Sequence, residues 1–270
     1  MEHGFRVNRK FVTTQSMQEK DNFIYGVNPV HEALKASKRR CHKVIVEEGK
    51  IHARIRAIMD LARSQDVRVE ILSRQIFQQK YQTCPHQGVI AYFSEKESIS
   101  LPGLIKRAYQ SDPQPTLVLL DEIQDPQNMG AIIRSAEVLG VQGIIIPKHR
   151  SAPLNETVAK CSAGAMETMP VAWVTNLAQA IEELKQEKFW IVGVDMDGEK
   201  NCHSFDFNMA TALVIGGEEK GIRPGLRKVC DFTVSIPMKG KIGSLNASAA
   251  SAVVFYEILR QKSVRQTSRK

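Results

Sequence analysis

Three short segments place glycine, asparagine or other small residues directly after an apolar run, the position where open α/β sheets bind their ligands. In the first segment, Asn128, Gly130 and Arg134 follow such a run. A guanidinium at this position can hold a phosphate through two parallel hydrogen bonds. Taken alone, the segment is more simply explained by a surface arginine that pairs with Glu122 or Glu137.

The second segment begins with Gly216 and Gly217, which follow another apolar run and precede Glu218. Paired glycines allow a ligand to approach the backbone closely, and a carboxylate can accept a hydrogen bond from a hydroxyl or an amine. Taken alone, this pattern is also that of an ordinary turn between a strand and a helix.

The third segment is the most unusual, because a generic amphipathic helix would not be built from so many small residues. We expect Ser244 to cap this helix, inside which the polar side chains of Asn246 and Ser248 need partners. Its residues of interest are Ile236, Pro237, Met238, Ser244, Leu245, Asn246 and Ser248.

Several common kinds of site are missing from the sequence. It has no glycine-rich dinucleotide fingerprint, no P-loop and no metal-ligand spacing. The five cysteines are widely spaced and include no Cys-x-x-Cys pair, so we expect reduced thiols. No run approaches the roughly 18 apolar residues of a membrane helix, and the N-terminus lacks the apolar core of a signal peptide. We therefore expect a soluble, cytoplasmic protein without a metal site and without membrane association.

Positive charge is concentrated in two parts of the chain, whose formal net charge is +8. Residues 24–97 carry 13 basic and 8 acidic side chains, and residues 259–270 carry 5 basic and no acidic ones. If a polyanion binds, these regions attract it. The alternative for the basic cluster at residues 38–43 is a solvated face, which is the simpler explanation for the cluster alone.

The length of 270 residues and the ordinary proportion of apolar residues favour two globular domains. Residues 1–23 are polar and show no periodicity, so we expect a flexible arm. Residues 24–97 have the pattern of a small α/β module whose first helix is capped by Asn28. Residues 98–115 surround one short helix with prolines and a glycine, and we expect them to form a linker.

Residues 116–260 alternate apolar strands with helices, which predicts an α/β fold with a parallel sheet covered on both faces. Residues 261–270 are expected to form a basic tail. The expected strands are Leu117–Leu120, Ile144–Ile146, Trp190–Val194 and Leu213–Ile215, and the expected helices lie around Ala131–Leu139, Val158–Cys161 and Leu177–Gln186.

In their order and spacing, the three segments resemble the motifs of the SpoU or TrmH-type RNA ribose 2′-O-methyltransferases of the SPOUT superfamily. Residues 24–93 are similar to the L30e-like RNA-binding module of bacterial enzymes that methylate a guanosine ribose in 23S ribosomal RNA. Relatives that act on tRNA share the catalytic domain. The motifs are Asn128-x-Gly130-x-x-x-Arg134, Gly217-Glu218-x-x-Gly221, and Ile236-Pro237-Met238 with Ser244-Leu245-Asn246-x-Ser248-x-Ala250.

The resemblance implies a C-terminal domain whose third motif is threaded through a loop as a trefoil knot, an exception to the rule that chains avoid knots. It implies that the knotted main chain holds S-adenosyl-L-methionine at Gly216, Ile236 and Leu245. Gly217 and Met238 are expected beside them. Because the family pairs two knotted domains, a homodimer with an active site at its interface is expected.

The resemblance also implies methyl transfer to a ribose 2′-oxygen of RNA. Arg134 is expected to bind the ribose hydroxyl and the adjacent phosphate, while Asn128 and Glu218 orient Arg134 or the substrate. Ser244 and Asn246 are expected to fix the reacting end of the site. A guanidinium with a pKa above about 12 is a poor proton acceptor, so we assign Arg134 to positioning and charge stabilisation.

The expected partner is RNA, and the expected substrate is a guanosine of 23S rRNA. Two alternatives remain open at this point. One is a methyltransferase that acts on a tRNA ribose, and the other is a non-catalytic RNA-binding protein, which the basic residues of the N-terminal module and the tail favour.

Overall fold

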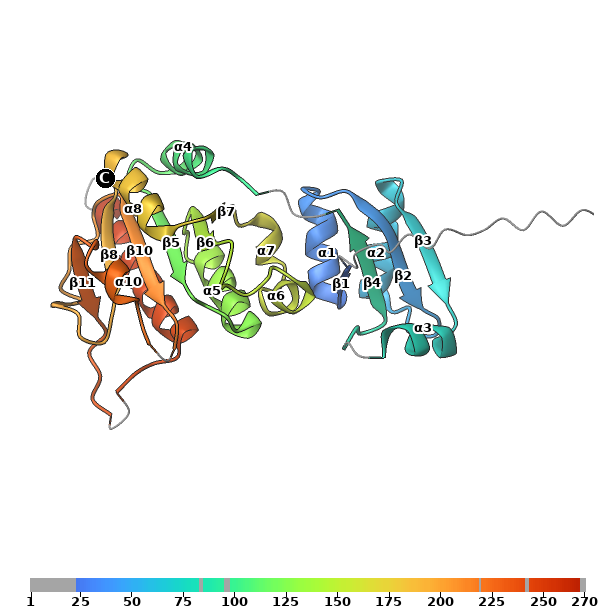
Figure 1. Cartoon of the computed structure of the whole chain (residues 1–270). Coiled ribbons are helices and arrows are strands. Elements are labelled where there is room, and N and C mark those ends of the chain that lie inside the picture. Colours follow the sequence, from blue (N-terminus) through green and yellow to red (C-terminus); the bar gives the residue numbers. More distant parts are fainter. Residues whose placement is uncertain (1–22, 83–84, 95–97, 219, 241–242, 268–270) are drawn as a thin grey trace, which may run out of the picture.

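The computed structural model describes residues 23–82, 85–94, 98–218, 220–240 and 243–267. These residues form two sheets that follow one another along the molecule (Figure 1). The expected flexible arm lies outside the described residues apart from Phe23, for which the expectation is wrong because Phe23 begins a strand. The expected basic tail is corrected as well, since residues 261–267 continue the last helix.

The N-terminal sheet has four strands in the order β1-β4-β2-β3, of which only β2 and β3 are parallel neighbours. Alternate strand residues join two different apolar clusters, so α1 and α2 pack on one face and α3 on the other. The elements are β1 (Phe23–Tyr25), α1 (Val27–Ala36), β2 (Cys41–Glu47), α2 (Ala53–Ser64), β3 (Arg68–Leu72), α3 (Arg74–Tyr81) and β4 (Val89–Phe93).

The cap of α1 differs from the expected one. Asn28 lies inside the helix, and the N-cap position is held by Gly26, which has a φ of 92° and no side chain. The side-chain oxygen of Gln87 accepts a hydrogen bond from the N–H of Val27 at 3.0 Å instead. The prediction that Asn28 caps α1 is therefore wrong, because the cap comes from a residue 60 positions away in the sequence.

The C-terminal sheet has seven strands in the order β7-β6-β5-β10-β8-β11-β9, and every described pairing in it is parallel. This confirms the predicted parallel sheet. Three short strands, β7, β9 and β11, were not among the expected ones. The strands are β5 (Thr116–Asp121), β6 (Gly143–Pro147), β7 (Val171–Val174), β8 (Trp190–Val194), β9 (Lys200–Asn201), β10 (Thr211–Gly216) and β11 (Phe232–Ser235).

Helices cover both faces of this sheet, as predicted. Leu117 and Leu119 of β5 join the apolar cluster that contains α4, α8 and α9, whereas Val118 and Leu120 join the cluster that contains α5, α6, α7 and α10. The helices are α4 (Leu101–Ser111), α5 (Pro126–Val138), α6 (Glu156–Cys161), α7 (Ala165–Thr168), α8 (Leu177–Gln186), α9 (Pro224–Arg227) and α10 (Ala247–Thr267).

The segment expected to be a linker is part of this second fold. Leu101 and Leu104 of α4 are buried in the cluster on one face of the sheet. Ile99, just before α4, forms an isolated parallel bridge with Ala172 of β7. The linker interpretation of residues 98–115 is therefore wrong for most of the segment, because the apolar side chains of α4 pack against the sheet.

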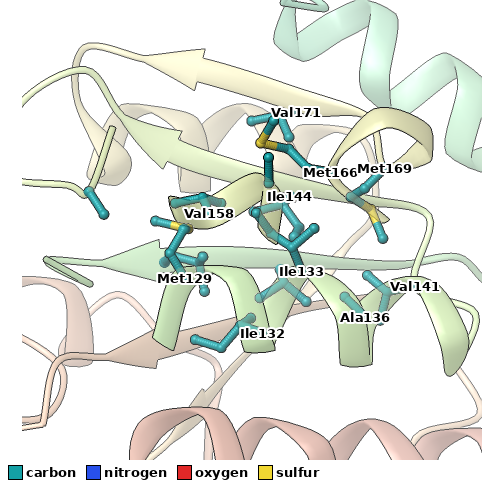
Figure 2. Packing of buried hydrophobic residues seen from close by; sticks show 14 of the residues in the cluster. Met129, Ile132, Ile133, Ala136, Val141, Ile144, Val158, Met166, Met169 and Val171 are labelled. Carbon is teal, nitrogen blue, oxygen red and sulfur yellow. The ribbon is translucent and has the colours of Figure 1, made fainter. Parts of the chain in front are cut away.

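Figure 2 shows Met129 and Ile133 of α5 packed among buried side chains that include Val158 of α6 and Ile144 of β6. At the crossing of α5 and α6, a Cβ added to Gly130 would lie 2.4 Å from the Cβ of Cys161. Real Cβ atoms do not approach so closely, so Gly130 is needed for helix packing. The glycine of the first motif thus has a structural role in positioning the start of α5.

None of the helices in the described ranges is long and apolar enough to cross a membrane. Among the same residues, no group of His, Cys, Asp and Glu side chains is arranged to hold a metal ion. The four described cysteines are free thiols, and burial raises the pKa of Cys41 and Cys230 to about 11. These two thiols are therefore protonated at neutral pH.

Candidate active site

The helix that carries the first motif starts earlier than expected. The side chain of Asp125 caps α5 by accepting a hydrogen bond from the N–H of Gln127 at 3.0 Å, and Pro126 occupies the first turn. The expected start around Ala131 is wrong, because Asp125 and Pro126 begin the helix earlier in the chain. Asn128 consequently falls in the first turn, where it is buried.

The polar side chains of the three motifs meet in one hydrogen-bond network. The amide nitrogen of Asn128 donates to Oε1 of Glu218 at 2.6 Å. Asn246 donates to Oδ1 of Asn128 at 3.0 Å and also to Oε1 of Glu218. Two amides therefore hold one carboxylate, and residues from α5, from the loop after β10 and from the start of α10 are fixed relative to one another.

Asn246 also caps α10. Its Oδ1 accepts hydrogen bonds from the N–H groups of Ser248 at 2.9 Å and Ala249 at 3.3 Å, and from the hydroxyl of Ser248 at 2.5 Å. The prediction that Ser244 caps this helix is therefore wrong. Both residues are of types that favour an N-cap, and the helix begins only at Ala247, so Asn246 is the one at the cap position.

A cavity of about 380 Å³ lies at the carboxyl ends of β8 and β10, within the usual range of small-molecule sites of about 300–1,000 Å³. Its lining includes every residue that the sequence predicts to hold the methyl donor and two of the predicted catalytic residues. These residues are Gly216, Gly217, Ile236, Met238, Leu245, Glu218 and Ser244.

The glycines of the second motif are required by close backbone approaches. A Cβ on Gly216 would lie 2.0 Å from the carbonyl carbon of Gly221, and one on Gly217 would lie 3.1 Å from the main-chain oxygen of Glu122. The loop after β10 therefore folds back directly onto its own strand. Main-chain groups line this side of the cavity, and a side chain at Gly216 would displace them.

An ion pair between Asp121 and Arg223 also holds this loop. Neither residue belongs to the three sequence motifs. Asp121 is fully buried at the end of β5, and its carboxylate accepts hydrogen bonds from the main-chain N–H of Arg223 at 3.0 Å and from its Nε at 2.8 Å. Hydrogen bonding to Asp121 raises the pKa of Arg223 above its ordinary value. The pair fixes the end of the loop that carries Glu218.

Asp195 is a further cavity residue that sequence reasoning missed. It follows β8 directly and lines the cavity, and its Oδ2 lies 3.5 Å from Nε of Arg227. The signal was present, since an acidic residue directly after a buried parallel strand lies at the ligand-binding edge. Its carboxylate places negative charge in the wall of the cavity.

A second cavity of about 450 Å³ adjoins the first one. Both are lined by Gly217, Glu218 and Lys220, while Asn128 and Asp125 line only the second. The network of Asn128, Glu218 and Asn246 therefore stands between two spaces, which allows two ligands to meet at Glu218.

Arg134 lies outside both cavities within one chain. It is exposed on α5, two turns beyond Asn128, and shares its face of the helix with exposed Val138. Six positions along a helix place Arg134 on a different face from Asn128. The expectation that the donor site faces Arg134 is thus not met inside a single chain.

Comparison with known proteins agrees with this geometry. Residues 115–256 match the profile of the SpoU rRNA Methylase family, and residues 23–99 match the profile described as RNA 2′-O ribose methyltransferase substrate binding. The first match alone spans more than half of the chain, and the second covers the N-terminal sheet and its helices.

Two similar proteins align with this chain over about nine tenths of its length. YacO of Bacillus subtilis, assigned by its name to the TrmH family of tRNA/rRNA methyltransferases, is 39% identical over 91% of this chain and 98% of that protein. The crystal structure of the SpoU methyltransferase AviRb from Streptomyces viridochromogenes in complex with the cofactor AdoMet gives a TM-score of 0.76 at 26% identity, covering 90% of both chains.

A third relative matches less of the chain. The TrmH/SpoU tRNA modifying enzyme of A. aeolicus gives a TM-score of 0.52 at 27% identity and covers 62% of this chain and 86% of that one. Together, the motifs, the cavity and these matches establish that the chain belongs to the SpoU (TrmH) family of RNA ribose 2′-O-methyltransferases, a family that uses S-adenosylmethionine as its methyl donor.

Proposed function

We propose that the first cavity holds S-adenosylmethionine in this chain, and that the second cavity receives the ribose to be methylated. The fit is supported by the apolar side chains of Met238 and Leu245, which are 38% and 42% exposed at the cavity and can cover an adenine. Main-chain groups beside Gly216 can bind its polar edge, and the carboxylates of Asp195 and Glu218 suit a positively charged sulfonium. The trefoil knot expected for the family is part of this proposal.

In the proposed reaction the ribose 2′-oxygen forms a bond to the donor methyl carbon as the bond from that carbon to sulfur breaks. The hydroxyl proton leaves to phosphate or water, and neutral S-adenosylhomocysteine remains. The sulfonium supplies the driving force, so the chain has to align the two reactants. Glu218, held by the amides of Asn128 and Asn246, stands where the two cavities meet and can orient the ribose. Ser244 lines the donor cavity beside it.

We further propose that the enzyme is a homodimer and that Arg134 acts in the site of its partner. α5 packs along α10, and both helices leave large apolar side chains exposed: Val138 at 69%, Tyr256 at 59% and Val253 at 41%. Such exposed apolar residues mark association surfaces. Because Arg134 lies on this exposed side of α5, pairing two copies would bring it toward the cavities of the other subunit, where it can hold the phosphate next to the reacting ribose.

The proposed substrate is ribosomal RNA, and within it a guanosine of the large-subunit 23S rRNA. One observation carries this choice: the chain has a substrate-binding domain at residues 23–99 beside the domain that matches the SpoU rRNA Methylase profile, whereas the tRNA modifying enzyme of A. aeolicus covers only 62% of the chain. The basic character of residues 24–97 suits RNA binding. Family membership favours an enzyme over a non-catalytic RNA-binding protein.

The test is to incubate the purified enzyme with methyl-labelled S-adenosylmethionine and either rRNA or tRNA from cells that lack the enzyme. We expect label in large-subunit rRNA at one guanosine and none in tRNA. Label confined to tRNA would instead establish the alternative, a tRNA ribose 2′-O-methyltransferase, and would overturn the rRNA proposal.

A further inference from the structure

The two folds of the chain contact each other through β1 and α1 on one side and α6 and α7 on the other. The approach is close, because a Cβ on Gly164, the residue before α7, would lie 2.5 Å from the Cβ of Glu32 in α1. Lys160 of α6 lies over the ring of Tyr25, with its Nζ 5.6 Å from the ring centroid. The N-terminal fold is thus docked against the methyltransferase fold and is not merely tethered to it.

A buried ion pair lies at this contact. Nη1 of Arg39 donates a hydrogen bond to Oε1 of Glu167 in α7 at 3.0 Å, and their side chains are only 6% and 3% exposed. The Nε of Arg39 donates to the main-chain oxygen of Ser94 at 2.8 Å, and its guanidinium lies 5.2 Å from the ring centroid of Phe93. Arg39 is therefore held by three groups.

A second cation from the same cluster contributes to the contact. Nζ of Lys38 donates to the main-chain oxygen of Thr168, the residue after Glu167, at 3.1 Å. Two members of the basic cluster at residues 38–43, which sequence reasoning assigned to a solvated face or to attracting a polyanion, are thus used between the folds. A buried ion pair of this kind favours one orientation of the two folds relative to each other, because the pair forms only in one geometry.

Each fold is anchored close to the chain that joins them. The N–H of Ser94 donates to the main-chain oxygen of Arg40, and the N–H of Ile99 donates to that of Val171. The five residue steps between Ser94 and Ile99 limit how far apart the folds can lie. Their orientation rests on the packing of α1 and β1 against α6 and α7, and Arg39 and Glu167 add a buried ion pair to this contact.

We infer that Arg39 and Glu167 form a latch that fixes the RNA-binding domain relative to the methyl-donor cavity, and that this fixed distance selects which nucleotide of a bound RNA is methylated. In Figure 1 the strand tips of β2 and β3 point to the same side of the molecule as those of β5 and β10. One RNA can therefore lie along the side of the molecule at which β2 and β3 of the first sheet and β5 and β10 of the second end. This inference rests on the proposed function, since it assumes that RNA contacts both domains.

The latch is tested with Glu167→Gln in the full-length enzyme. A basic cluster that only attracts RNA and a latch predict opposite changes in the affinity of this variant for RNA. If the cluster only attracted RNA, removing a nearby acid would tighten RNA binding. If the pair is a latch, Arg39 is left buried without its counter-charge, the domains separate, and the KM for RNA rises by about tenfold or more. We expect methylation at additional nucleotides, while the Kd for S-adenosylmethionine and the kcat at saturating RNA stay within about twofold.

Two further variants separate the latch from a general loss of charge. Arg39→Gln combined with Glu167→Gln removes both buried charges, so we expect it to be closer to wild type than either single variant. Lys35→Gln removes an exposed cation from α1, four residues before Arg39, and should change neither the KM nor the methylated site. Effects of Arg39→Gln and Glu167→Gln that simply add, or a Lys35→Gln variant that behaves like Arg39→Gln, would overturn the inference.

Small-angle X-ray scattering provides a readout that does not depend on the substrate. We expect a larger radius of gyration for Glu167→Gln than for wild type at the same oligomeric state, and a return toward the wild-type value in the double variant. Unchanged scattering for the single variant contradicts the latch, whatever RNA the enzyme methylates. Absence of rRNA methylation by the wild-type enzyme would instead contradict only the proposed function.

Discussion

At the scale of single residues, the proposed donor cavity depends on local geometry that Gly216 and Asn246 maintain in different ways. Gly216 allows the loop after β10 to fold back against its own strand, where a Cβ would lie 2.0 Å from Gly221. Asn246, in the third motif, fixes Glu218 by hydrogen bonding. The first residue acts by the absence of a side chain and the second by its amide, so their variants should fail in different ways.

We expect Gly216→Ala to weaken binding of S-adenosylmethionine by about tenfold or more, because relieving the overpacked contact costs about 1–3 kcal/mol. Isothermal titration calorimetry measures this directly. The matched control is Gly225→Ala, whose added Cβ would meet nothing within 4 Å and which should bind normally. Normal binding by Gly216→Ala would show that this backbone contact does not shape the donor site.

Asn246 combines a cap with the active-site network, and two variants separate these roles. Asn246→Ala removes both, so we expect a loss of stability of about 1 kcal/mol together with a large loss of kcat. Asn246→Asp retains a good capping oxygen but places a carboxylate beside Glu218, so it should lose kcat with a smaller loss of stability. Thermal unfolding and methyl-transfer rates measure the two effects. Full activity of Asn246→Asp would contradict the role given to the network.

At the scale of elements, the loop that caps α1 is sensitive to protonation of His86. Nδ1 of His86 accepts a hydrogen bond from the N–H of Gly88 at 3.0 Å, which requires that nitrogen to be unprotonated. Burial lowers the pKa of His86, an effect that the neighbouring charge of Glu47 opposes and that of Lys50 supports. Because Gln87 lies between His86 and Gly88, the same loop carries the cap of α1.

The sign of the pH effect follows from this shift. Below the unfolded pKa of about 6.5, the unfolded chain takes up a proton that the folded His86 resists, so stability falls as the pH drops toward the lowered folded value. We expect thermal unfolding of wild type to move to lower temperature between about pH 7 and pH 5. His86→Gln should reduce this dependence, whereas His42→Gln, at an exposed site, should preserve it. Equal slopes for His86→Gln and wild type would contradict the assignment.

Elements with a strong apolar pattern could be predicted well from the sequence. The strand Trp190–Val194 and the helix Leu177–Gln186 have the expected bounds, and the parallel arrangement followed from the alternation of strands with helices. The strand Val171–Val174 is too short for its period to be recognised. Caps were less predictable, because two candidates compete within three residues at Ser244 and Asn246, and the cap of α1 comes from Gln87.

At the scale of the whole molecule, two features of the site could not be predicted from local patterns. The grouping of residues around the proposed donor cavity could be predicted, since the positions named by the resemblance line one cavity. The pair of Arg39 and Glu167 could not, because it joins residues 128 positions apart in different folds. The outward position of Arg134 also escaped prediction, because it depends on where α5 begins and on which face of α5 is buried.

The proposed dimer makes a quantitative prediction about mixtures. Arg134→Ala and Glu218→Gln should each be inactive alone, and Arg134→Ala should still bind S-adenosylmethionine. If the partner's Arg134 completes each site, a co-expressed equal mixture contains mixed dimers with one intact site, which restores about a quarter of wild-type activity. If Arg134 serves its own subunit, no mixed dimer has an intact site. A mixture as inactive as its components would therefore place Arg134 in its own subunit.

The most direct test of the central claim identifies the atom that receives the methyl group. After transfer from methyl-labelled S-adenosylmethionine, the RNA is hydrolysed in alkali, which cleaves only next to a free ribose 2′-hydroxyl. A methyl group on the 2′-oxygen prevents cleavage, so we expect the label in an alkali-resistant dinucleotide. Label released in single nucleotides would place the methyl group on a base and would contradict the assignment of the second cavity to a ribose.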